Sequence, residues 1–154
     1  MASTNIPTKL KKSQVVAAGP KISFDSDTLV CLIVTAGSGI PNTTSSGVQF
    51  ISDVTAANPE VTGTGYSRQT LTATTVAYDG ISNITVDFSF GNITFLQNSS
   101  GFSNGRYIIF ADTSIGAGDA SHPVLAVCDP GQNLSVVSND IVLSSPVGGL
   151  IQWV

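Results

Sequence analysis

The sequence is short of charge, and it has no long apolar run. Only 10% of its 154 residues are charged, well below the roughly 25% that is typical of soluble domains. The mean hydropathy is +0.28, yet the longest apolar run, Leu29–Val34, is far shorter than the ~18–20 residues of a membrane-spanning helix. No apolar signal core follows the N-terminus, so we expect no secretory signal and no membrane partner. Because Ser, Thr, Asn and Gly replace the charged residues, we expect a largely uncharged polar surface.

Residues that could perform catalysis are scarce. His122 is the only histidine, and no Gly-x-Ser-x-Gly motif accompanies it. A nucleophile needs a base within hydrogen-bonding reach and a third group that orients the base. Gly63-Thr64-Gly65 lacks the third glycine of a dinucleotide fingerprint, and it precedes a predicted strand rather than a helix. The sequence therefore predicts no enzyme and no cofactor, with His122 as the one base that a hydrolase could use.

Metal ligands are equally sparse. A zinc site needs three or four Cys or His ligands, whereas this chain has two cysteines and one histidine, far apart in the sequence. Asp25 with Asp27, or Asp112 with Asp119, could bind calcium, but neither pair lies in an Asp-x-Asp-x-Asp-Gly loop. Aspartates in turns more often accept hydrogen bonds from their own backbone. We therefore predict no metal.

Both cysteines, Cys31 and Cys128, lie in apolar runs that are typical of strands. A free cysteine at such a position behaves as a small hydrophobic residue. We expect both to pack in the core, and a disulfide remains open only if the fold makes them neighbours.

Positive charge is concentrated at one end of the chain. Four of the six basic residues precede the first acidic residue, Asp25; they are Lys9, Lys11, Lys12 and Lys21. Residues 1–21 thus form a predicted basic arm of charge +4, and residues 22–154 form a body in which two arginines face ten acids. With a pI near 4.5, the whole chain is a poor binder of nucleic acid. The arm could contact an acidic partner or the body of a neighbouring copy; the alternative is a solvated terminus.

The body shows the two-residue period of β-strands. From Asn83 to Phe90, apolar and polar residues alternate strictly, as in a half-buried strand. Asp79-Gly80 suits a hairpin turn before it. Three of the predicted strands are nearly continuous apolar runs and should be central in a sheet. The predicted strands are Thr28–Thr35, Thr70–Ala77, Asn83–Phe90, Ile93–Leu96, Arg106–Ala111, Val124–Cys128, Leu134–Val137, Asp140–Leu143 and Leu150–Trp153.

This pattern indicates an all-β, single-domain body, a β-sandwich or barrel of about eight short strands with an extended N-terminal arm. Val15 and Val16 could add a short edge strand from the arm. One turn of helix is expected around residues 49–56. No internal repeat of useful length appears.

The segment from Phe50 to Leu71 is polar, contains turns, and holds no catalytic constellation. Gly63 and Gly65 allow a positive φ or a close backbone approach. Tyr and Arg are the residue types that anchor protein interfaces. We therefore predict that the segment either contacts another subunit or braces the loop that does so. The candidate interface residues are Lys9, Lys11, Lys12, Lys21, Asp53, Glu60, Tyr66, Arg68 and Trp153.

Several segments between Ile22 and Val154 carry a resemblance to a known family. They are Asp27–Leu32, Phe50–Val54, Glu60–Tyr66, Leu71 with the strand that follows it, Arg106–Phe110, Pro123–Ala126 and Gly149–Trp153. In these segments the chain resembles small virion structural proteins of tailed bacteriophages, the head decoration or cement proteins. The more specific marks are Glu-Val-x-Gly-x-Gly-Tyr, ending at Tyr66, and the strand that begins Arg106-Tyr107. The chain departs from the family pattern at residues 92–95, where a Trp is expected.

The resemblance implies a protein that binds the lattice of the major capsid protein and stabilises the head. It would be made in the cytoplasm of the bacterial host and end on the capsid surface of the virion. Many symmetric copies multiply modest contacts, and the resemblance implies a trimer, with a dimer as the alternative. A minor tail or head-fibre component that binds host glycans is the other interpretation, and it would need an exposed aromatic side chain such as Tyr66, Tyr78 or Trp153.

Overall fold

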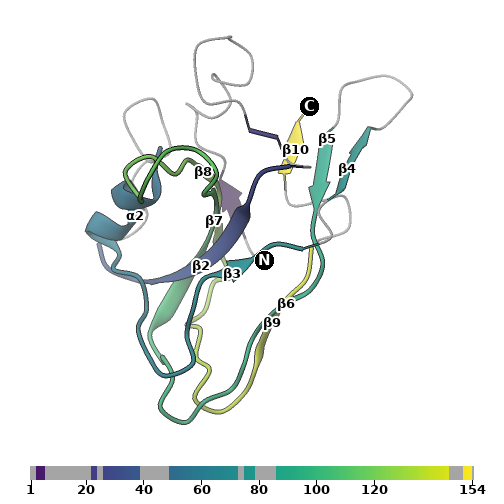
Figure 1. Ribbon diagram of the computed structural model, residues 1–154. Helices are drawn as coiled ribbons and strands as arrows, with labels where there is room; N and C mark the ends of the chain where they lie inside the picture. Colours follow the sequence, from purple (N-terminus) through teal and green to yellow (C-terminus); the bar gives the residue numbers. More distant parts are fainter. Residues whose placement is uncertain are drawn as a thin grey trace.

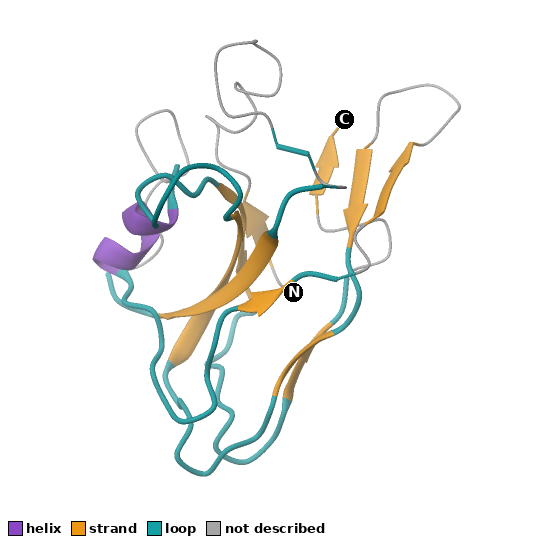
Figure 2. Ribbon diagram, viewed as in Figure 1, coloured by secondary structure: helices purple, strands orange, loops and turns teal. Residues whose placement is uncertain are grey.

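The computed structural model describes residues 3–5, 22–23, 26–38, 49–72, 75–78, 86–145 and 151–153. These residues are mostly β-structure, with one short helix among them (Figures 1 and 2). Among these residues all the strand pairs are antiparallel, and no sheet closes into a barrel. The prediction of a mostly β fold is confirmed, and a sandwich-like arrangement is compatible with it. Within the described part of the chain, no helix has the length and apolar character needed to cross a membrane.

A five-stranded sheet forms the centre of the fold, in the order β1-β8-β7-β2-β3. Its strands are β1 (Ser3–Asn5), β2 (Leu29–Thr35), β3 (Gln69–Thr70), β7 (Gly105–Asp112) and β8 (Val124–Asp129). The three longest, β2, β7 and β8, are nearly continuous apolar runs and occupy the three inner positions. This confirms the prediction that such runs are central, because a strand covered on both faces must be apolar on both.

Helix α2 (Ile51–Ala57) covers one face of this sheet (Figure 1). Every second residue of β2 points to it, and Ile51 and Val54 of the helix are fully buried there. The prediction of one helical turn over residues 49–56 was therefore nearly correct. The cluster beneath the helix consists of Val30, Leu32, Val34, Ile51, Val54, Ile109, Ala111, Val124 and Val127.

The opposite face packs against a two-stranded ribbon, β6 (Ile93–Phe95) and β9 (Ile141–Leu143), and against the loops beside it. In Figure 1 the ribbon and helix α2 lie on opposite sides of β2. The larger of the two hydrophobic clusters fills this space. It contains Ile22, Leu29, Cys31, Ile33, Val61, Leu71, Phe90, Ile93, Phe95, Phe102, Ile108, Phe110, Leu125, Ala126, Cys128, Leu134 and Val136.

Neither cysteine is in a disulfide, and both are buried in this second cluster. Cys31 lies on β2 and Cys128 on β8, so that β7 separates them in the sheet. Burial raises the pKa of the Cys31 thiol well above its usual value, as expected for a thiol in apolar surroundings. The prediction of core packing is confirmed.

Because of a β-bulge, strand β8 contributes side chains to both hydrophobic clusters. Phe110 pairs with Ala126 but Ala111 pairs with Val124, so Leu125 is an extra residue on β8. Because an extra residue interrupts the two-residue alternation, Val124 and Val127 both face the helix while Leu125 and Ala126 both face the other cluster.

The remaining sheet has the order β10-β5-β4 and comprises β4 (Thr75–Tyr78), β5 (Val86–Ser89) and β10 (Ile151–Trp153). The predicted strand Asn83–Phe90 is thus confirmed over β5. Tyr78 pairs with Val86, so the connection runs over residues 79–85. The hairpin turn predicted at Asp79-Gly80 lies outside the described residues.

Two predicted strands need correction. Residues 134–137 were predicted as a strand, but only Leu134 forms a β-bridge, an isolated one with Gly105. Val136 instead bonds to the loop carbonyl of Phe102. The predicted strand over residues 70–77 divides into β3 and β4, because the backbone of Leu71 and Thr72 bonds to two different neighbours, Leu29 and Gly91.

The N-terminal arm is described only at β1, which pairs with β8 through Ser3↔Asp129, Thr4↔Cys128 and Asn5↔Val127. The edge strand predicted at Val15 and Val16 lies outside the described residues, as do the four lysines of the arm.

Candidate functional site

The predicted contact segment is anchored on strand β2. Its backbone pairs with β2 at Glu60, opposite Val34, and returns to pair as β3, with Gln69 opposite Cys31. The loop between these points leaves the backbone N–H of Ile33 without a strand partner. The Tyr66 hydroxyl accepts this N–H at 3.0 Å and donates to Glu60 Oε1 at 2.8 Å. A side chain thus takes the place of the missing strand.

The glycines of this loop have the conformations that were predicted for them. Gly65 has a φ of +81°, which side-chain-bearing residues adopt at a cost. A Cβ on Gly63 would lie 2.7 Å from the backbone of Gly101 and Phe102, so the close approach requires glycine. Thr64 donates its backbone N–H to Ser100 O at 3.0 Å. The loop is therefore held against the 98–102 turn as well as against β2.

The Tyr66 ring is held by contacts with two other aromatic rings. It stacks on Phe95, with ring centroids 5.9 Å apart, and meets the edge of Phe102 at 5.5 Å. Burial, and then the negative charge of Glu60, raise the pKa of the Tyr66 hydroxyl above its usual value. This hydroxyl therefore stays protonated and can keep donating to Glu60.

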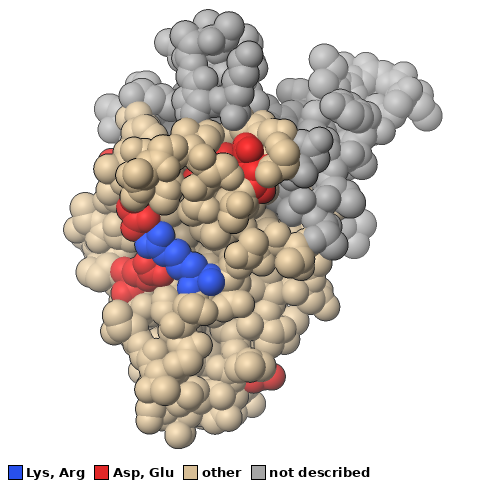
Figure 3. All heavy atoms as spheres, in the orientation of Figure 1, with Lys and Arg blue, Asp and Glu red and all other residues tan. Residues whose placement is uncertain are grey.

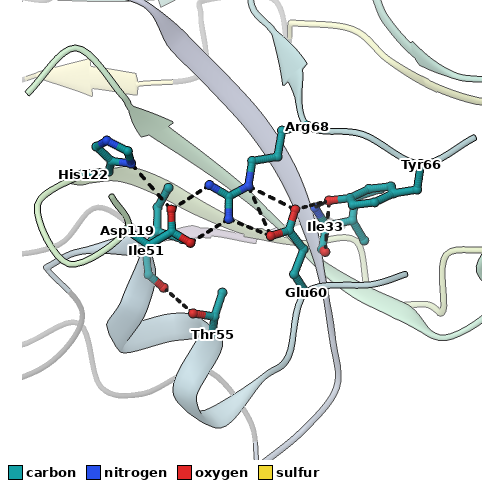
Figure 4. A network of polar contacts seen from close by, with 8 residues as sticks. All are labelled: Ile33, Ile51, Thr55, Glu60, Tyr66, Arg68, Asp119 and His122. Carbon is teal, nitrogen blue, oxygen red and sulfur yellow. Dashed lines mark hydrogen bonds and ion pairs between the residues drawn. The ribbon is translucent and has the colours of Figure 1, made fainter. Parts of the chain in front are cut away.

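Arg68 is the centre of the polar network (Figure 4). Its Nη2 lies 2.7 Å from Glu60 Oε2 and 2.7 Å from Asp119 Oδ2, while Nη1 lies 2.7 Å from Asp119 Oδ1 and Nε lies 3.1 Å from both Glu60 oxygens. One planar guanidinium thus forms two bidentate pairs, a geometry that lysine cannot reproduce. The side chains are 23–34% exposed, so solvent screens the pairs in part.

Hydrogen bonds from Arg68 lower the pKa of Asp119 below its usual value, with smaller contributions from the Arg68 charge and from His122. His122 Nδ1 lies 3.5 Å from Asp119 Oδ1, a long contact for a hydrogen bond. The prediction considered Asp119 only as a calcium ligand and His122 only as a base. In the structure both carboxylate oxygens of Asp119 are held by Arg68.

Asp119 and His122 belong to the loop between β7 and β8, which also caps helix α2. The first helical N–H groups, of Ile51 and Ser52, donate to the carbonyls of His122 (3.0 Å) and Asp119 (3.1 Å). Helix N–H groups at this end have no partner within the helix, and the loop supplies one. The network therefore joins three segments: the Glu60–Arg68 loop, the β7–β8 loop and the helix.

Asp53 completes the cap from inside the helix. Its Oδ2 accepts the backbone N–H groups of Gln49 and Phe50, each at 2.9 Å. A carboxylate near a helix N-terminus also opposes the positive end of the helix dipole.

Four of the predicted interface residues, Asp53, Glu60, Tyr66 and Arg68, therefore make internal contacts, of which the last three share one network. These contacts brace the loop within the chain, and the prediction that the residues or their loop contact another subunit stays a prediction. Trp153 lies in β10, apart from this network, and the four lysines lie outside the described residues. Asp119, the second partner of Arg68, was missed because 51 residues separate the two in the chain.

The two cationic side chains of the described body are both neutralised internally. Arg68 has the partners given above, and Arg106 Nη2 lies 2.9 Å from Asp129 Oδ1. Figure 3 shows basic atoms lying directly beside acidic ones on the face in view. Among the described residues, no three His, Cys, Asp or Glu side chains gather as metal ligands. In the Arg68 network the guanidinium is paired within the chain, and the side chains remain partly exposed to solvent.

No family model matches the sequence, and neither the curated proteins nor the solved structures contain a chain that is significantly similar to it.

Proposed function

We propose that this chain is a structural protein of the virion of a tailed bacteriophage, a decoration protein that binds the lattice of the major capsid protein. It would carry out no catalysis and need no cofactor. The proposal rests on the family resemblance and on the separation of charge between the arm and the body, both of which are features of the sequence.

The structure adds an observation on the positive charge of the body. The arginines of the body, Arg68 and Arg106, are both held by carboxylates of the same chain. The other basic residues of the sequence are Lys9, Lys11, Lys12 and Lys21, all in the arm and outside the described residues. Such an arm can attach to an acidic surface while the acidic body stays outward.

The arm also begins with a strand. Ser3–Asn5 pair with the edge of β8 of the same chain, so main-chain hydrogen bonds hold the start of the arm against its own body. Removing residues 1–21 would uncover this edge. A sharper perturbation changes the four lysines to glutamine and leaves β1 in place.

The experiment measures cosedimentation of this quadruple variant with expanded, empty capsids of the phage that encodes the chain. We expect binding about tenfold weaker at low salt, because four screened charge contacts together contribute ~1.4 kcal/mol. Binding of the wild type should weaken with salt, and that of the variant should respond much less. As a control, changing Ser3 and Thr4 to alanine preserves all charges. Equal occupancy of the variant and the wild type at every salt concentration would contradict the proposal.

The β6–β9 ribbon offers an apolar surface that suits contact between copies. Leu96 is 70% exposed and Val142 56% exposed, whereas their neighbours Phe95 and Ile141 pack inward. We include this pair in the proposed trimer contact, with a dimer as the alternative. Changing Leu96 to Ser should shift the sedimentation coefficient toward the monomer, and the buried-face variant Phe95→Leu should not.

The glycan-binding alternative, a minor tail or head-fibre component, gains no support from Tyr66. A sugar-stacking aromatic needs a free ring face, and this ring packs on Phe95 and Phe102.

A further inference from the structure

Asn104 is the only asparagine of the sequence that a glycine follows, and it lies at an exposed position just before β7. The side-chain amide of an asparagine can be attacked by the backbone nitrogen of the next residue, a reaction that the side chain of that next residue hinders. Glycine has no Cβ, so Gly105 offers its nitrogen without this hindrance. The pair is therefore a candidate for spontaneous deamidation, which needs water and no enzyme.

Packing requires a glycine at position 105. A Cβ there would lie 2.7 Å from Ile33 Cγ2, 3.0 Å from Phe102 Cε2 and 3.1 Å from Leu134 Cβ. All three neighbours belong to the larger hydrophobic cluster, and Ile33 is completely buried. Because a close-packed interior has little room to yield, a side chain that would hinder the attack does not fit at this position.

The fold instead holds the attacking nitrogen in an isolated bridge. Gly105 donates its backbone N–H to Leu134 O at 3.0 Å, and Leu134 donates its backbone N–H to Gly105 O at 2.7 Å. Attack on Asn104 Cγ requires Gly105 N to lose its proton and to turn toward the side chain. A hydrogen-bonded N–H is shielded from base in the solvent until the bond opens. The bridge therefore has to open before the reaction can start.

We propose that Asn104 is a site of spontaneous deamidation that the Gly105–Leu134 bridge protects in the folded chain. When the bridge opens, Gly105 N forms a bond to Asn104 Cγ. The proton of this nitrogen and the side-chain amino group leave together as ammonia, and a cyclic succinimide remains. Water then adds to either carbonyl of the ring and opens it, which gives aspartate or isoaspartate.

Either product changes the start of β7. Both add a negative charge to an acidic chain, and isoaspartate also inserts a methylene group into the backbone directly before Gly105. Gly105 pairs with Thr35 of β2 as well as with Leu134, and the longer backbone displaces these hydrogen bonds. A chain that has opened at the bridge and reacted is therefore altered permanently.

The test follows the conversion of Asn104 in the full chain at pH 8, folded and in concentrated urea. A protease that cleaves after aromatic residues releases Ser103–Tyr107, in which Asn104 is the only amide side chain, and mass spectrometry gives the converted fraction. A zero-time sample corrects for conversion during digestion. Because the rate follows the population of the open form, we expect conversion at least about tenfold slower in the folded protein than in urea.

Two leucine variants separate the bridge from general destabilisation. Leu134→Ala and Leu143→Ala each shorten a leucine that packs in the larger cluster, but only Leu134 belongs to the bridge. We expect the folded Leu134→Ala protein to convert several times faster than wild type, the Leu143→Ala protein to convert at nearly the wild-type rate, and all three to convert equally in urea. Asn104→Gln, which would have to form a larger ring, is the blank.

Equal rates in folded and unfolded wild type would overturn the proposal. So would the absence of conversion at Asn104 in urea, or an equal acceleration by the two leucine variants. If Leu134→Ala does not fold, the comparison of folded and unfolded wild type decides the matter alone.

Discussion

Replacing Arg68 by alanine should destabilise the fold more than any other single charge removal in the described body. The change leaves Glu60 and Asp119 facing each other without the guanidinium that both contact at 2.7 Å. Breaking a fully buried pair costs about 3–5 kcal/mol, whereas an exposed pair is worth about 0–1 kcal/mol. With side chains 23–34% exposed, we expect a loss of roughly 2 kcal/mol, which corresponds to about 4–8 °C in melting temperature for a chain of this size.

The assay is urea unfolding at pH 7, with Arg106→Ala as the matched control. Arg106 is similarly exposed, at 23%, but forms one ion pair, with Asp129, and lies 5.6 Å from the Tyr107 ring centroid, so its removal should cost about 0.5–1 kcal/mol. Added salt should reduce the difference in unfolding free energy between the two variants, because screening weakens the ion pairs that each substitution removes. If Arg68→Ala unfolds no earlier than Arg106→Ala, the network does not brace the fold and the reasoning fails.

Three further predictions concern the same region. Gly63→Ala, whose Cβ would lie 2.7 Å from Phe102 N, should lower the free energy of unfolding by about 1–3 kcal/mol; an unchanged urea midpoint would contradict the close approach. Tyr66→Phe should cost about 1 kcal/mol in the same assay and leave the near-ultraviolet dichroism of the packed rings intact, whereas a neutral change would show that the hydroxyl contacts contribute nothing. The pKa of Asp119 is lowered in the fold, so its stabilisation is present above its ordinary pKa and is lost as pH falls; Asp119→Asn should therefore lose less stability than wild type between pH 6 and pH 3.

The parts of the fold that could be predicted from the sequence are those in which one local pattern has one structural solution. The apolar runs of β2, β7 and β8 have to be covered on both faces, and all three are inner strands. Gly63 and Gly65 marked a place of unusual backbone geometry, which the close approach to Phe102 and the positive φ explain.

The parts that could not be predicted depend on contacts between distant segments. Nothing near Arg68 in the sequence indicates that Asp119 is its partner, because the two meet only after β7 and β8 have formed. Residues 134–137 show the alternation of a strand but bond to an irregular turn at Phe102.

The central claim, that the chain decorates a phage capsid, is tested most directly by a reconstruction of the virion of the phage that encodes it. The account predicts density for the β-body at symmetric positions on the outer capsid shell, with the basic arm against the major capsid protein. Density on the tail or on a fibre, or virions that lack the chain altogether, would contradict it.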